Sequence, residues 1–465
     1  MKTRRLLATS LVPAGLLAGT AAAMPAGTPE TDLSQVLDRM NQLEQEVGRL
    51  RGVEAELARL KAATDADAME EARRTEIRGV VADALADADT RASMLQAGMV
   101  AGWDGGFKLG SSDGSYTLNI GGLMQFRYVH SLQDDSASGD DSRGGFENQR
   151  TYLTFSGNIV DPSWVYKIRA GVDNTYGGND GDFELYEAYA GKVLGDGLVL
   201  VAGQVKVPML REAGMDEKGV QGASRSLLSN EFDPQFTQGV ALSYSQDAFK
   251  VIGALTDGHY ALSGRNQPWN TYDAEISLTA RAEFLLAGTF DQFDDMTSAP
   301  GGEYGLLVGG ALHHQVGEYG TTAVETDATQ WTIDVSAEFD RANVFVAYVD
   351  RNVTGSAFDA SGIMVQGGYY VTDAWEAYAR YEYLDADVDD GELSVITVGA
   401  NYYFAGNNAK FSADVGYALD EVTSFWAGGA GGAGLGAGGA VDGWRQDGDG
   451  EDGQLVLRGQ FQLAF

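Results

Sequence analysis

Charged residues are concentrated in the segment PMLREAGMDEKGVQGASRSLLSNEFDPQ, which spans residues 208–235. Its basic and acidic side chains include Arg211, Asp216, Glu217, Lys218 and Arg225. Fixed charges act strongly on a passing ion wherever a narrow, low-dielectric passage strips the ion of water. We therefore predict that this segment forms the constriction of a pore. The alternative is that its charges only hold the segment against a wall through salt bridges.

Further charged residues recur at every second position of apolar segments. A period of two places alternate side chains on opposite faces of a β-strand. Unpaired charge is costly in a dry protein core, whereas a water-filled lumen accommodates it. The residues that we predict to line such a lumen are Arg127, Lys167, Arg169, Lys206, Arg281, Arg380, Glu382 and Arg458.

The sequence offers little for catalysis or metal binding. It has four histidines and no serine in a recognisable nucleophile elbow, so a barrel hydrolase is disfavoured. His313 and His314 are adjacent, and adjacent strand residues point to opposite faces. We expect no catalytic residues, no metal site and no cofactor. The net charge of −35 gives no reason to expect nucleic acid as a partner.

The elements that carry these charges alternate strictly. TLNIGGLMQFRYV and WEAYARYEY each place aromatic and aliphatic residues on one face and charges on the other. The segment GQLVLRGQFQLAF does the same up to Phe465, with Phe461 and Leu463 on the apolar face. This arrangement is typical of the closing strand of an outer-membrane β-barrel. It also resembles the signal read by the barrel-assembly machinery, so we expect that machinery and outer-membrane lipid as partners.

The number of strands follows from a parity argument. Short joints such as DPS, GDG, SQDA, DRAN and VTDA are typical of periplasmic turns, which alternate with longer external loops. Counting residues 285–293 as a strand gives 17, but bacterial single-chain barrels have an even number. We therefore assign residues 284–303 to a long periplasmic turn. The predicted fold is all-β, an antiparallel barrel of 16 strands.

The first hundred residues differ from the rest of the sequence. Residues 1–23 combine a basic start, an apolar stretch and a small-residue cleavage site, which is typical of a secretory signal peptide. In residues 24–100, apolar side chains from Leu33 to Leu57 follow a heptad spacing. We predict a periplasmic helical coiled coil there, followed by a barrel domain at 101–465. Three coiled-coil chains would suit a homotrimer, and the alternative is one amphipathic helix packed on the barrel.

The ordered segments RTYLTFSGNIVDPSWVYKIRAGVD, GQVKVP, SRSLLSNEF and FDQFDDMTSAPGGEYG followed by GLLVGGALHHQ resemble the phosphate-selective porin O/P family. The likeness extends over most of residues 105–465. It implies an exported, 16-stranded, trimeric porin of the outer membrane. Members of this family allow passive, substrate-biased diffusion, and inward-folded loops narrow their pores.

The distribution of charge bears on selectivity. Acidic residues cluster in DDSASGDD (134–141), DADVDDGE (385–392) and DGDGEDG (447–453), which we place in external loops. Such a field attracts cations and repels anions, although these acids could instead bind divalent ions or only solvate the loops. We therefore expect a porin for small ions and hydrophilic solutes without strong phosphate selectivity. A phosphate- or anion-selective porin and a plugged barrel that tethers the envelope are the alternatives.

Overall fold

The computed structural model describes residues 38–56, 79, 98–103, 106–173, 183–258, 274–317, 327–354, 359–427 and 441–465. The chain divides into two compact units, Met1–Asp89 and Thr90–Phe465. The predicted signal peptide lies outside the described residues. In the first unit, residues 38–56 form a helix on which Met40, Leu43, Val47 and Leu50 are exposed. The helical part of the prediction is therefore confirmed for this stretch, while the coiled coil stays a prediction.

No helix in the described part of the chain is both long and apolar enough to cross a membrane.

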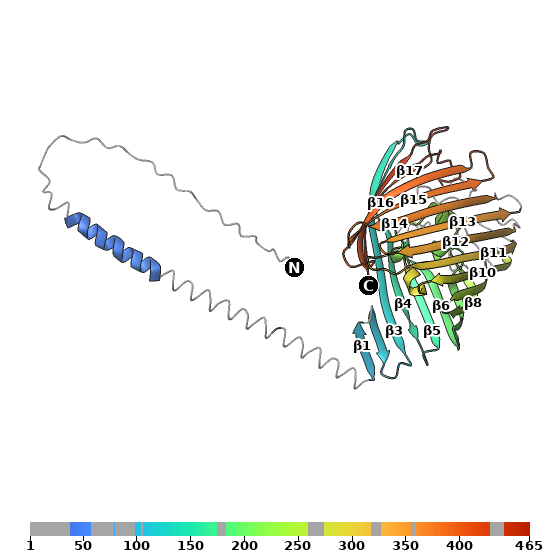
Figure 1. Cartoon of the computed structure of the whole chain (residues 1–465), viewed down its shortest axis with the longest axis horizontal. Coiled ribbons are helices and arrows are strands. Elements are labelled where there is room, and N and C mark those ends of the chain that lie inside the picture. The colour runs from blue at the N-terminus through green and yellow to red at the C-terminus, as the bar shows by residue number, and fades with distance from the viewer. Residues whose placement is uncertain are drawn as a thin grey trace, which may run out of the picture. The chain divides into compact units, whose positions relative to one another are not determined.

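The second unit is a closed antiparallel barrel of 16 strands (Figure 1). Each strand pairs with its neighbours along the chain, and the last strand pairs with the first. The predicted strand number is thus confirmed. The strands are β3 (Thr117–Leu132), β4 (Ser142–Asn158), β5 (Trp164–Asp173), β6 (Glu184–Gly195), β7 (Leu198–Lys206), β8 (Phe236–Gln246), β9 (Phe249–Thr256), β10 (Ala274–Ala287), β11 (Gly305–Gly317), β12 (Ala328–Phe339), β13 (Ala342–Val353), β14 (Ala360–Tyr370), β15 (Trp375–Ala386), β16 (Glu392–Tyr403), β17 (Ala409–Ala418) and β18 (Leu455–Ala464).

Burial alternates along the strands as the sequence predicts. In β3, Met124 and Phe126 are exposed, whereas Gln125 and Arg127 are buried. In β15, Glu376 and Arg380 are buried, and Trp375 is exposed. Apolar side chains therefore cover the outside of the barrel, and polar and charged side chains point inward.

The assignment of residues 284–303 to a long turn is wrong at its two ends. Residues 284–287 belong to β10, and the connection to β11 runs over residues 288–304. It contains the short 3-10 helix η3 (Phe290–Asp294), whose capping box is formed by Thr289 and Gln292. No additional strand lies in this fully described connection, so the even count holds.

A strand hairpin before the barrel was not foreseen. It consists of β1 (Met99–Trp103) and β2 (Phe107–Ser111), and β2 pairs with the first residues of β3. β18 pairs with the following part of β3, from Leu123 to Leu132. Phe107 and Phe465 meet where these two partners of β3 adjoin, with ring centroids 5.9 Å apart.

Candidate functional site

The connection between β7 and β8 folds into short helices whose apolar side chains are buried. They are α2 (Arg211–Gly214), the 3-10 helix η2 (Glu217–Gly219) and α3 (Leu227–Phe232). The side chain of Asp216 caps η2 by accepting from the Lys218 amide, and Ser226 caps α3 by accepting from the Ser229 amide. Met209, Leu228 and Phe232 belong to the main apolar cluster of the barrel unit. We call residues 207–235 the inward loop.

The inward loop is bound to the wall formed by β3 and β5. Gln125 Nε2 donates to the Glu217 carbonyl over 3.3 Å, and Arg127 Nη1 donates to Ser224 Oγ over 2.7 Å. Arg169 on β5 forms an ion pair with the Glu217 carboxylate. Arg127 and Arg169 are two of the residues predicted to face inward. Gln125 lies on the same face of β3 as Arg127.

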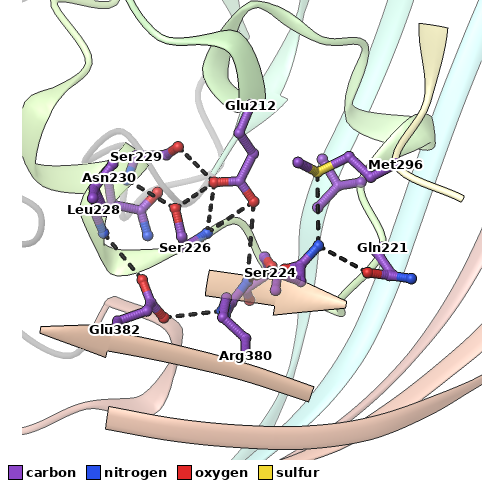
Figure 2. Close-up of polar contacts among 12 residues, drawn as sticks. Glu212, Gln221, Ser224, Ser226, Leu228, Ser229, Asn230, Met296, Arg380 and Glu382 are labelled. Atoms are coloured by element: carbon purple, nitrogen blue, oxygen red, sulfur yellow. Dashed lines mark hydrogen bonds and ion pairs between the residues drawn. The ribbon is translucent and has the colours of Figure 1, made fainter. Parts of the chain in front are cut away.

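The same loop is bound to strands β13 to β17. Figure 2 shows Arg380 of β15 between two carboxylates, with Glu382 at 2.9 Å and Glu212 of the loop at 4.0 Å. Farther along the wall, Arg351 of β13 pairs with Glu231 at 2.7 Å. On β17, Lys410 Nζ donates to the Val220 carbonyl over 2.6 Å. The loop therefore crosses the lumen and is held by strands from both sides.

The Glu217 carboxylate of the inward loop lies between two guanidinium groups. It pairs with Arg169 and, within the loop, with Arg225 Nη2 at 3.2 Å. Burial alone would raise the pKa of Glu217, but the charges of Arg169 and Arg225 hold that pKa below its ordinary value. The loop is thus fastened at this point by an ionised group between two guanidinium groups.

The 288–304 connection also reaches the inward loop. The Met296 amide donates to the Gly219 carbonyl over 3.0 Å, and Asn343 on β13 donates to the Met296 carbonyl. Arg211 of the inward loop lies over the Phe293 ring, with 5.6 Å between the guanidinium carbon and the ring centroid. Two connections from opposite ends of the barrel therefore meet inside it.

The five residues predicted for the constriction have two kinds of environment. Glu217 and Arg225 are buried in the ion pairs described above, and Arg211 lies 3.7 Å from Glu283. Asp216 and Lys218 are exposed. Of the five, these two are the side chains most accessible to a solute next to the inward loop.

The predicted lumen residues are almost all paired with carboxylates. Only Lys167 keeps substantial access to solvent, with 28% of its side chain exposed. The remaining pairs are Arg127 with Glu147 and Asp442, Lys167 with Glu187, Lys206 with Asp233, Arg281 with Asp334, and Arg458 with Asp414. This pairing leaves little convergent positive charge of the kind that clamps phosphate.

A cavity of about 810 Å³ opens at the end of the barrel that carries the long loops. Among the described residues of its lining, Arg351 is the one basic residue, and it is already paired with Glu231. Backbone amides donate to several of the carboxylates, such as Ser394 to Asp420 and Gly450 to Glu421. The acidic residues of the lining are Asp350, Asp359, Asp385, Asp387, Asp390, Glu392, Asp420, Glu421, Glu451 and Asp452. We call this cavity the acidic vestibule.

Several residues of the site were not singled out from the sequence. Lys410 stands on the polar face of an alternating strand, so the period of two could have identified it. Gln221 Nε2 donates to Glu376 over 2.6 Å. Gln221 and Asp442 both belong to connections between strands, where no periodicity marks the direction of a side chain. The prediction that His313 and His314 point to opposite faces of the strand is confirmed, because His313 is buried and His314 is exposed.

Comparison with known proteins supports the resemblance drawn from the sequence. The family model for phosphate-selective porins O and P matches residues 305–419. The matched family consists of porins, which are non-enzymatic channel proteins. A search of curated proteins gave no match.

The solved structures that match this chain are distant from it in sequence. An anion-selective porin from Comamonas acidovorans is 15% identical and has a TM-score of 0.51, covering 75% of this chain and 99% of that one. OmpT of Vibrio cholerae, in its trimer form, is 16% identical with a TM-score of 0.47, covering 74% and 99%. The DcaP channel of Acinetobacter baumannii is 11% identical with a TM-score of 0.45, covering 78% and 100%. At such identity, the likeness to the Comamonas porin shows a shared barrel fold.

Proposed function

We propose that this protein is an outer-membrane porin through which small ions and hydrophilic solutes diffuse passively. The observation that carries the proposal is the inward loop, which is bound to both sides of a closed barrel with a charged interior. Such a loop narrows the lumen without blocking it. The family match over residues 305–419 agrees with this function.

The acidic vestibule supports a preference for cations. Its carboxylates concentrate cations and repel anions before a solute reaches the inward loop. Among the predicted site residues, Asp216 and Lys218 of the inward loop and Lys167 of β5 have the most access to solvent. Because the predicted lumen arginines are paired with carboxylates, strong phosphate selectivity is not part of the proposal.

Export and assembly complete the proposal. Residues 1–23 direct export, and residues 24–100 lie in the periplasm, where the apolar stripe of the 38–56 helix joins three chains. The outward-facing side chains of Phe461, Leu463 and Phe465 contact outer-membrane lipid and, during insertion, the barrel-assembly machinery. The 38–56 helix supports this view because its stripe is exposed in the single chain.

One observation favours a second function, a plugged barrel that tethers the envelope. Half of the predicted lumen charges are no more than 4% exposed, namely Arg127, Arg380, Glu382 and Arg458. A barrel filled to this degree could serve as an anchor for the helical segment instead of a pore.

Reversal potentials of the purified protein in a planar bilayer under a KCl gradient distinguish these functions. We expect a cation-sided potential and no block by added phosphate. An anion-sided potential with phosphate block would favour the anion-selective alternative. A correctly folded protein that carries no current would overturn the pore and favour the anchor.

A further inference from the structure

The connection between β17 and β18 also sends a short segment into the barrel. Asp442 lies in the 3-10 helix η4 (Val441–Gly443) and is only 3% exposed. Its backbone is in the left-handed region, with a φ of 55°. A residue other than glycine rarely adopts this conformation unless its surroundings hold it there.

The following residue explains how the backbone can come so close to the wall. Gly443 has a φ of 95°, and a Cβ at this position would lie 2.6 Å from side-chain atoms of Val129 and Val456. Only glycine therefore allows this close approach to β3 and β18. Trp444 is 2% exposed and belongs to the main apolar cluster of the barrel unit.

Both carboxylate oxygens of Asp442 accept hydrogen bonds inside the barrel. Arg127 Nη1 on β3 donates to Oδ1 over 2.6 Å, and Asn230 Nδ2 of the inward loop donates to Oδ2 over 3.1 Å. Arg458 Nη1 on β18 donates to the Asp442 carbonyl over 3.4 Å. Burial would raise the pKa of Asp442, but Arg127 and Arg458 lower it to about 2, so the group is an anion at neutral pH.

These donors form a set that suits a small oxyanion. The Arg127 guanidinium and the Asn230 amide donate to the carboxylate, and the Arg458 guanidinium donates to the backbone carbonyl of the same residue. In addition, Nη2 of Arg458 is buried and has no hydrogen-bond partner within the described residues. The set therefore has donor capacity that its present occupant does not use.

We propose that Asp442 determines specificity by occupying the Arg127–Asn230–Arg458 donor set as a tethered anion, which denies this set to small oxyanions in the lumen. The inference rests on the proposed pore function and adds to it a residue that disfavours anions. It also links the last long connection of the barrel to the inward loop, because Asn230 belongs to that loop.

The test compares Asp442→Asn with Asp449→Asn in planar bilayers. Asp449 lies in the same connection and is exposed, so its variant makes an equal change of charge away from the donor set. We expect D442N to shift the reversal potential toward anions more than D449N does. We also expect inorganic phosphate to reduce the D442N current saturably, and to leave the wild-type and D449N currents unchanged.

Two further variants keep the test decisive. Asp442→Gly removes the carboxylate and suits a φ of 55°, so it should fold even if D442N does not, and it should show the same phosphate block. The double variant R127Q/D442N removes one of the two guanidinium groups, and we expect it to lose the block.

The outcomes separate this inference from the pore function. If the wild type conducts but D442N and D442G behave like D449N, the role of Asp442 is overturned and the pore stands. If block persists in R127Q/D442N, the donor set is wrong. If folded wild-type protein carries no current, the pore function fails and this inference fails with it.

Discussion

The ring of Phe465 lies directly over Gly122 of β3. The two residues exchange both backbone hydrogen bonds, at 2.9 and 3.0 Å. A Cβ at Gly122 would lie only 2.4 Å from Cζ of the ring. The ring can therefore adopt its position because residue 122 has no side chain.

Substituting Gly122 by alanine should consequently destabilise the junction of β3 and β18. The added methyl group must displace the ring, and overpacking of this kind costs about 1–3 kcal/mol. We expect G122A to lower the temperature at which the barrel loses its heat-modifiable mobility in gel electrophoresis. The matched control is Gly145→Ala on β4, where an added Cβ meets nothing within 4 Å.

A second protein, which lacks the ring, tests whether the ring of Phe465 causes the loss of stability in G122A. In a Phe465→Ala protein, the same G122A substitution should have little further effect because the ring is gone. An equal loss in both backgrounds would show that the methyl group disturbs the strand itself and that the ring is not responsible.

Removing the charge of Glu217 should loosen the inward loop. In Glu217→Gln, Arg169 and Arg225 lose their shared carboxylate, and breaking a buried ion pair costs about 3–5 kcal/mol. We expect single-channel recordings of E217Q to show larger and noisier currents than the wild type. The control is Asp216→Asn, an equal change of charge at an exposed neighbour, which should leave the current noise unchanged. Equal noise in E217Q and the wild type would contradict a fastening role for Glu217.

The cation preference should weaken as the pH falls. Burial and the nearby carboxylates of Asp449 and Asp390 raise the pKa of Glu421 in the acidic vestibule. This group therefore gains its proton at a higher pH than an ordinary glutamate, and each proton bound removes one negative charge from the vestibule. Reversal potentials measured from pH 7.5 down to 4.5 should move toward zero. In Glu421→Gln, the part of this shift that begins at the highest pH should be absent. A reversal potential that does not depend on pH would contradict a selective role of the vestibule.

Deleting residues 24–97 should leave a barrel that inserts into the membrane but no longer forms trimers. The deletion leaves β1 and the whole barrel intact, so we expect the protein to insert and conduct. Cross-linking should then recover monomers instead of trimers, because the exposed stripe of the helix is lost. Replacing Leu43 and Leu50 by alanine removes part of the stripe at constant length and should act in the same direction. Trimers that survive both changes would locate the contact between chains in the barrel.

The sequence predicted the parts of this fold that depend on periodicity. Gln125 and Arg127 face inward and Met124 and Phe126 outward because alternate strand positions must do so. The inward fold of residues 208–235 was predicted from the length of this segment and from the resemblance to porins. The β1–β2 hairpin was missed because MVAGW has no alternation of polar and apolar residues.

Pairings between distant residues could not be predicted in the same way. Arg127 and Asp442 are 315 residues apart in the sequence, and their contact depends on a left-handed backbone in a loop. Likewise, nothing in the sequence around Lys410 shows that its ammonium group bonds carbonyl oxygens of the inward loop. Such contacts are fixed by tertiary structure and not by local pattern.

The closing ladder between β3 and β18 has a consequence for folding kinetics. Gln125 Nε2 donates to Gln462 Oε1 across it, although 337 residues separate the two side chains. Contacts between such distant positions form late, since the entropy of closing a long loop must first be overcome. The reverse process is equally hindered, because opening the barrel breaks a continuous row of hydrogen bonds before any strand is released. Resistance of this protein to heat in detergent should therefore depend on a slow rate of opening, and the apparent melting temperature should rise with the scan rate.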